Sequence, residues 1–136
     1  ILLLRRNMQQ TNLTNGHSEA VSGRFAAKML LAFLGVVAWS FHGMEMPADW
    51  FLENILVAVF LGILVATWRR NGLSRASYWM LFGFFVCHEY GAHWKYADVP
   101  LGEWLKGPFQ TSRNHYDRVM HFAFGLLCSW PLAEAT

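Results

Sequence analysis

Four apolar blocks, each close to the length of a membrane span, divide the sequence. They cover residues 26–44, 50–68, 76–94 and 118–136, and the last block is still apolar where the chain ends. A helix of about 20 residues crosses a hydrocarbon core of about 30 Å. Arg, Lys, Trp and Tyr, which anchor helices at membrane interfaces, lie at the block ends. The blocks therefore predict four spanning helices.

The alternative fold is a water-soluble bundle of buried helices. Such helices carry a polar stripe that repeats with the helical period, whereas residues 57–67, VAVFLGILVAT, have no polar face. Only 15% of the residues are charged and 54% are hydrophobic, against about 25% charged in soluble domains. This composition also excludes an intrinsically disordered chain. We predict an all-α fold, a polytopic integral membrane helical bundle with about four spanning helices.

Charge and cysteine content exclude two further classes. The formal net charge of +2 is small and scattered, which argues against a nucleic-acid-binding protein. Cys87 and Cys128 both lie inside apolar blocks, so the sequence contains neither a disulfide framework nor a zinc-finger pattern. The expected partner is the lipid bilayer.

Basic residues collect in alternate loops, which predicts an orientation. The loop between the first two blocks carries acidic residues and no Lys or Arg. By the positive-inside rule, the amino terminus and the loop between the second and third blocks are cytoplasmic, and residues 95–117 lie outside. We predict a multi-pass membrane protein with a cytoplasmic amino terminus. The basic residues are Arg24, Lys28, Arg69, Arg70 and Arg75.

The two ends of the chain differ from its middle. Residues 1–24 are expected to form a loose cytoplasmic tail, because residues 8–23 are polar and without periodicity. Residues 1–7, which precede Met8, are expected to be an artefact of upstream translation or a fragment edge. Residues 25–136 form the predicted membrane domain, and we expect its carboxyl-terminal part to be missing because the last block ends without a basic flank.

Polar side chains gather between Cys87 and His121, where four of the six histidines lie. Ionisable groups at the ends of spanning helices are costly and mark functional sites. Glu89 and His93 are four residues apart, as are Asp117 and His121, so each pair shares a helix face. Two facing helices that each present a carboxylate and an imidazole can bind a metal or perform acid–base chemistry.

Two candidate sets follow from these pairs. Neither spacing matches the HExxH or Glu-x-x-His motifs of known metal sites. Asp117 has an alternative role as a helix cap, and His121 as a hydrogen-bonding group within the bundle. Arg113 suits a phosphate, because its planar guanidinium donates two bonds at once, which makes an anionic lipid headgroup a candidate partner. The candidate ligands of a divalent metal are His88, His93, Asp117 and His121, and the candidate catalytic residues are His88, Arg113, Asn114, Asp117 and His121.

The same region carries a family pattern. Its parts are WFLEN at 50–54, RRNGLS at 69–74, HEYGAH at 88–93 and RNHYDRVMHF at 113–122. This pattern resembles the YjdF-like bacterial inner-membrane proteins, a family of unknown function, over roughly residues 25–136. The resemblance implies a multi-pass protein of the bacterial cytoplasmic (inner) membrane. In this family an acidic segment and another spanning helix follow a residue like Glu134. It implies no established reaction.

Three functions are compatible with these features. We rank first a membrane-embedded enzyme that acts on a lipid or envelope substrate, then a structural or assembly protein, then a proton-coupled transporter. Residues 98–110 contain Pro100, Gly102, Gly107 and Pro108, so we expect a loop or short interfacial helix rather than a span. If the third and fourth spanning helices are antiparallel neighbours, His88 or His93 lies within reach of Asp117 or His121.

Overall fold

The computed structural model describes residues 21–136, which contain five helices and no strand. The predicted all-α fold is confirmed. Most of the expected amino-terminal tail, residues 1–20, lies outside the described residues. The helices are α2 (Gly23–Phe41), α3 (Pro47–Thr67), α4 (Arg75–His93), α5 (Pro100–Phe109) and α6 (Tyr116–Ala135).

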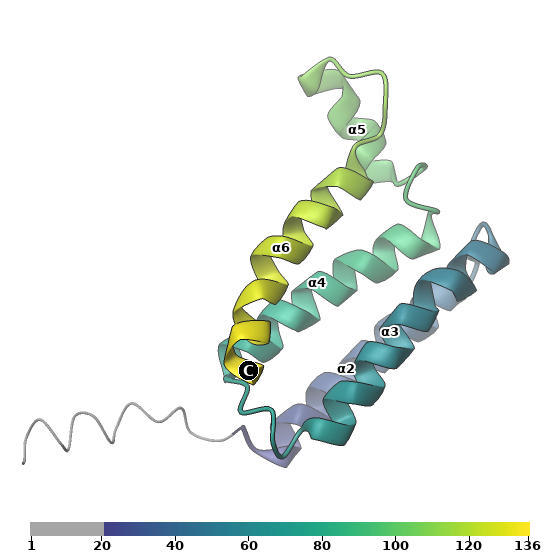
Figure 1. The fold of residues 1–136 in the computed structure, drawn as a ribbon. Coiled ribbons are helices and arrows are strands. Elements are labelled where there is room, and N and C mark those ends of the chain that lie inside the picture. The colour runs from purple at the N-terminus through teal and green to yellow at the C-terminus, as the bar shows by residue number, and fades with distance from the viewer. Residues whose placement is uncertain (1–20) are drawn as a thin grey trace, which may run out of the picture.

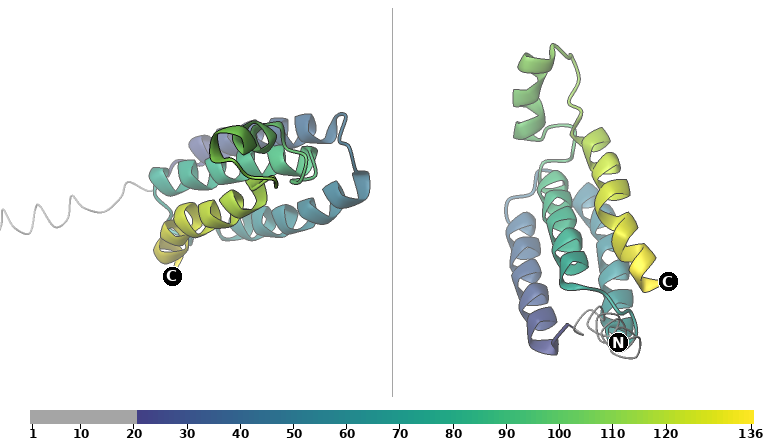
Figure 2. Two further views of the ribbon diagram at one scale, coloured as in Figure 1. Left: turned by 90° about the horizontal axis from the view of Figure 1, so that it is seen from above. Right: turned by 90° about the vertical axis from the view of Figure 1, so that its left-hand side faces the viewer.

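Helix α4 is the centre of the bundle. It packs against α2, α3 and α6, and these three pairs make the main helix contacts of residues 21–136. Figures 1 and 2 show α4 between the others, with successive long helices running in opposite directions. The end of α4 and the start of α6 therefore lie at the same end of the bundle.

Local sequence explains where the helices begin and turn. Ser22 and Ser74 each accept a hydrogen bond from the backbone N–H three residues later, at 3.2 Å, and so cap α2 and α4. Pro47 begins α3, where its missing N–H is not needed. Gly43 and Gly72 adopt φ values of 73° and 61° in the two connecting turns, a conformation that glycine adopts without steric cost.

The four long helices have the dimensions of membrane spans. They contain 19, 21, 19 and 20 residues, which corresponds to about 28–32 Å at about 1.5 Å per residue. By length and composition, α2 and α3 are apolar enough to cross a membrane. Helices α4 and α6 are as long, and they carry the polar residues of the candidate site. Each predicted block matches one of the four long helices. Each helix begins one to three residues before the corresponding block.

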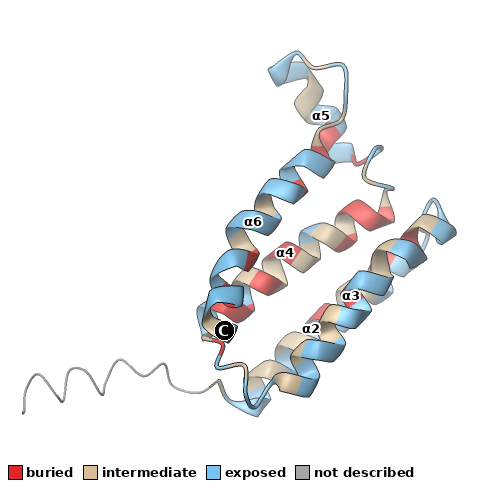
Figure 3. Ribbon diagram, in the orientation of Figure 1, coloured by how far each residue is buried: buried red, intermediate tan, exposed pale blue. Residues whose placement is uncertain are grey.

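The outward faces of these helices are apolar. Leu31, Leu56 and Phe122 are 69%, 71% and 72% exposed, and Figure 3 shows how much of the helix surface is uncovered. Exposed apolar surface on this scale marks contact with lipid or with other protein. Between α4 and α6 lies the core, which consists of Leu73, Tyr78, Leu81, Phe84, Val99, Tyr116, Met120 and Cys128.

Helix α5 confirms the prediction for residues 98–110. It has 10 residues, about half the length that a span requires. Its carboxyl end is set by Gln110, which adopts the left-handed conformation at φ 50°. Trp104 on this helix is 68% exposed. The segment between α4 and α6 is therefore a short surface helix flanked by two loops.

At the opposite end of the bundle, one carboxylate ties α6 to α4. Glu134 Oε2 accepts hydrogen bonds from the Ser74 backbone N–H at 2.9 Å and from the Ser77 hydroxyl. Glu134 Oε1 accepts another from Trp130 Nε1 at 3.1 Å. The carboxylate thus satisfies a backbone donor at the start of α4, which would otherwise lack a partner.

Candidate functional site

The loop after α4 folds back onto the helix it has just left. Lys95 and Tyr96 adopt positive φ values of 59° and 52°, and the Tyr96 backbone N–H donates to the Gly91 carbonyl at 2.7 Å. A Cβ on Gly91 would lie 2.8 Å from the Tyr96 ring and 2.9 Å from the Tyr116 ring. Gly91 is therefore the residue that lets the Tyr96 ring lie against α4.

This reversal brings Tyr96 to His88. The Tyr96 phenol oxygen lies 2.6 Å from His88 Nδ1. Burial, followed by the nearby Glu53 carboxylate, raises the pKa of Tyr96 well above its usual range, so the phenol remains protonated and donates this bond. A neutral His88 ring then carries its own proton on Nε2. Nε2 is buried and has no hydrogen-bond partner in residues 21–136.

Glu89, the next residue of α4, is fully buried. Neither of its carboxylate oxygens has a hydrogen-bond partner among the described residues. The nearby polar side chains are Ser40 and Asn54. Ser40 Oγ donates to the Glu89 backbone carbonyl at 3.1 Å, and Asn54 Nδ2 donates to the Trp50 carbonyl at 3.0 Å. The Ser40 hydroxyl proton is therefore used by a backbone carbonyl, whereas the Asn54 amide keeps a second N–H near the Glu89 carboxyl group. Neither side chain makes a hydrogen bond of ordinary geometry with the carboxylate oxygens.

His93 faces α2. Its Nδ1 lies 2.9 Å from the Ser40 carbonyl oxygen, and its ring stacks on Trp39 with centroids 4.9 Å apart. The side chain is buried. Glu89 and His93 thus share the helix face that their spacing predicted. His93 is held against α2 and makes no hydrogen bond or ion pair with Asp117 or His121.

Asp117 and His121 form the other predicted pair, at the start of α6. His121 Nδ1 lies 3.4 Å from Asp117 Oδ1 and 2.8 Å from the Asp117 carbonyl oxygen. Both side chains are exposed, at 62% and 79%. Across from them, Glu53 on α3 lies within electrostatic range of both residues, and its backbone lies beside the His88 ring.

Arg113 and Asn114 differ in their surroundings. Arg113 is exposed in the loop before α6. Asn114 Nδ2 donates to the Val99 carbonyl at 3.0 Å and to Glu103 Oε1 at 3.1 Å. Its Oδ1 accepts from the backbone N–H of Tyr116 at 3.0 Å, so a free donor at the start of α6 is satisfied by Asn114 and not by the alternative cap, Asp117. Asn114 therefore holds the loop and both flanking helices together.

Glu103, which accepts one of these bonds, is an exposed residue of α5. The hydrogen bond from Lys106 Nζ at 2.7 Å, with a smaller contribution from Asn114, lowers the pKa of the Glu103 carboxyl. The ion pair lies within α5 and holds the Glu103 carboxylate in place, and the Asn114 bond joins α5 to the segment before α6.

The predicted site residues thus fall into three groups. Asp117 pairs with His121, His88 pairs with Tyr96, and His93 is bonded to α2. In the part of the chain that the structure describes, no three His, Cys, Asp or Glu residues are placed to hold a metal ion. Tyr96 links the first two groups, since it contacts His88 and lies within electrostatic range of Asp117.

Sequence reasoning did not single out three contributors. Tyr96 was not among the predicted site residues, and its signal in the sequence is the glycine five residues earlier. Glu53 lies inside an apolar block and was also not among them. Ser40 carried no signal, because its partner Glu89 is 49 residues away in the sequence. We define the polar cluster as Glu53, His88, Glu89, Tyr96, Asp117 and His121.

Comparison with known proteins gives the family. Inner membrane protein YjdF of Escherichia coli (strain K12) is 35% identical over 82 residues, which cover 57% of this chain and 37% of that protein. The chain thus covers little more than a third of the length of this curated relative. No solved structure matches the chain. The model of the family described as "Predicted membrane protein (DUF2238)" matches residues 25–136. The chain belongs to this DUF2238 family of membrane proteins.

Proposed function

We propose that the protein is a multi-pass enzyme of the bacterial inner membrane that performs acid–base chemistry on a lipid or envelope substrate at the polar cluster. In the proposed topology α2, α3, α4 and α6 cross the bilayer, and the cluster lies at the outer face. The observation that carries the proposal is the Glu89 carboxyl group, which is fully buried and has no partner for either oxygen.

Such a group is expensive to maintain in a helix bundle. An unpartnered buried polar group costs about 1–3 kcal/mol, and buried polar atoms are therefore almost always hydrogen-bonded. Two adjacent residues of α4 break this rule, since His88 Nε2 also lacks a partner. On the α3 side, His88 lies near the Glu53 backbone and Glu89 lies near the Asn54 side chain, and neither neighbour completes a hydrogen bond of ordinary geometry. The free donor and acceptor positions of His88 and Glu89 support a role in transferring protons to and from a substrate.

Five residues of the polar cluster and Arg113 have proposed roles. His88 is the general acid or base, and Tyr96 fixes the ring so that Nε2 faces the substrate. Glu89 is the second proton-transfer group. The exposed Asp117–His121 pair exchanges protons with water at the mouth of the site. Arg113, in the exposed loop, binds an anionic headgroup. The proposed chemistry uses these side chains and assigns no step to a metal.

A strain that lacks the gene tests the proposal. Lipid and envelope extracts of the deletion strain are compared with the parent by mass spectrometry, and the strain is then complemented with variants. We expect the wild-type gene to restore the parental profile, and Glu89→Gln and His88→Asn to fail at equal protein level in the membrane. Glu45→Gln and His42→Asn alter exposed residues of the α2–α3 connection and serve as matched controls that restore it. Unchanged extracts in the deletion strain, or restoration by both cluster variants, would contradict the proposal.

A structural or assembly role is the second candidate, and His93 and Asn114 favour it. Both use their polar atoms to join segments that are far apart in the sequence. If this role is the whole function, Glu89→Leu is expected to function as well as the wild type, because an apolar side chain removes the cost of the unpartnered carboxyl group.

A further inference from the structure

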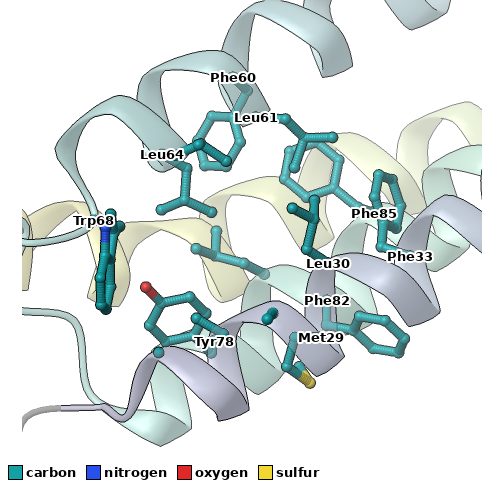
Figure 4. Close-up of a pocket in the computed structure, with 15 residues that line it drawn as sticks. Met29, Leu30, Phe33, Phe60, Leu61, Leu64, Trp68, Tyr78, Phe82 and Phe85 are labelled. Carbon is teal, nitrogen blue, oxygen red and sulfur yellow. The ribbon is translucent and has the colours of Figure 1, made fainter.

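The half of the bundle opposite the polar cluster contains an apolar cavity of about 250 Å³. It forms because α2 and α3 both pack mainly on α4 rather than on each other. Figure 4 shows Leu30, Phe60, Leu64 and Phe85 around it. A cavity of about 150 Å³ is enough to hold a benzene molecule, so this one has room for a larger apolar group.

The mouth of the cavity lies at the bundle end where α2 begins and α3 ends. Gly23, Ala27 and Trp68 belong to the cavity lining and are exposed. The Tyr78 hydroxyl, a polar group of the wall, lies on the Trp68 side of the cavity in Figure 4. The exposed lining residues and the Tyr78 hydroxyl therefore lie at one end of the cavity, where the Trp68 ring also lies close to Gly23.

Two arginine side chains lie against aromatic rings at this end of the bundle. The Arg69 guanidinium lies 5.8 Å from the centroid of the Trp68 ring, and the Arg75 guanidinium lies 5.4 Å from that of Phe25. Both arginines make cation–π contacts and no ion pair within residues 21–136. Glu134, the carboxylate at this end of α6, is bonded to Ser74 and Ser77 instead. The mouth therefore combines an apolar opening with uncompensated positive charge.

We propose that this cavity holds an acyl chain of an anionic phospholipid whose phosphate lies between Arg69 and Arg75. The apolar wall matches a hydrocarbon chain, and the guanidinium forks match phosphate oxygens. The uncompensated charge of the two arginines favours the lipid over a further helix of the protein as the occupant.

Photocrosslinking in vesicles tests the proposal. The protein is reconstituted with a trace of phosphatidylglycerol or phosphatidylcholine that carries the same diazirine-labelled acyl chain. We expect phosphatidylglycerol to label the α2 and α3 peptides of the cavity wall about tenfold more than phosphatidylcholine, as for one charge-assisted contact. The double variant Arg69→Gln/Arg75→Gln, which changes surface residues, is expected to reduce this labelling to the phosphatidylcholine level.

A cavity-filling variant separates the acyl chain from simple surface attraction. Ala27→Phe fills the mouth and is expected to abolish labelling of the wall peptides. Ala38→Phe on the same helix and Arg118→Gln on α6 change exposed residues outside the cavity and are expected to label as the wild type. Equal labelling by both lipids, no labelling by either, or full labelling of Ala27→Phe would overturn the proposal. If Ala27→Phe does not fold, the labelling of Arg69→Gln/Arg75→Gln tests the proposal, and labelling of this variant at the wild-type level would overturn it. The enzyme proposal does not depend on the outcome.

Discussion

The Tyr96 phenol lies 2.6 Å from His88 Nδ1 because the chain reverses at two residues with positive φ and lays the tyrosine over Gly91. The bond joins the loop after α4 to the last turns of that helix. It also determines which nitrogen of His88 is free, because a phenol that keeps its proton donates to Nδ1 and leaves the N–H on Nε2.

Removing the phenol is expected to impair the proposed function and to change the pH dependence of stability. The folded state raises the pKa of Tyr96, so the folded chain keeps a proton that the unfolded chain releases above about pH 10. The contribution to the free energy of unfolding is thus complete below that pH and is lost as the pH rises. We expect the Tm of the wild type, measured by fluorescence in detergent, to fall more steeply between about pH 9 and pH 11 than that of Tyr96→Phe.

The control for this measurement is Tyr90→Phe. Tyr90 is half-buried on α4, and its hydroxyl makes no hydrogen bond within residues 21–136. The Tm of Tyr90→Phe is expected to depend on pH in the same way as the Tm of the wild type. Parallel pH curves for Tyr96→Phe and the wild type would contradict the prediction.

Gly91→Ala is expected to destabilise the protein by about 1–3 kcal/mol, the usual cost of overpacking. Its Cβ would meet the rings of Tyr96 and Tyr116, which belong to two different segments. Gly83, on the same helix, has open space at the same position. Gly83→Ala is therefore expected to be neutral or stabilising, by up to about 1 kcal/mol. Unfolding of both variants in detergent checks the difference, and equal stabilities would show that the Tyr96 contact is not required.

Gly102→Ala is expected to disconnect α5 from the start of α6. A Cβ on Gly102 would lie 1.9 Å from Asn114 Oδ1, so the Asn114 side chain must move and lose its bonds to Val99 and Glu103. We expect faster proteolysis in the loop 110–115. Gly107, on the same short helix, has no atom within 4 Å of its Cβ position, and Gly107→Ala is expected to leave the digestion pattern unchanged. Identical cleavage rates for the two variants would refute this assignment.

Cysteine labelling tests the proposed orientation. With Cys87 and Cys128 replaced by alanine, single cysteines at Arg70 and Trp104 are treated with a membrane-impermeant maleimide in intact cells. We expect labelling at position 104 and none at position 70, because basic loops remain on the cytoplasmic side. Labelling at position 70 before the cells are permeabilised would show that the orientation is the opposite of the one proposed.

The sequence allowed the helices to be predicted because they depend on local properties. Apolar blocks of bilayer length located all four long helices, and the prolines and glycines of residues 98–110 predicted a loop or short helix that does not span the membrane. The pairing of Asp117 with His121 follows from helical spacing alone. In contrast, the partner of His93 is a carbonyl 53 residues earlier, and the isolation of Glu89 depends on how α2 and α3 pack around it. Such long-range packing has no periodic signal in the sequence.

The central position of α4 also has a consequence for how the protein enters the membrane. A helix that contains Arg75, Glu89 and His93 partitions poorly into lipid alone, and α4 buries these last two residues against its neighbours. The more apolar α2 and α3 precede it in the chain. We expect α4 to insert efficiently only when this hairpin is already in the bilayer. In a glycosylation-mapping assay, α4 fused behind α2–α3 should span the membrane, whereas α4 alone should not.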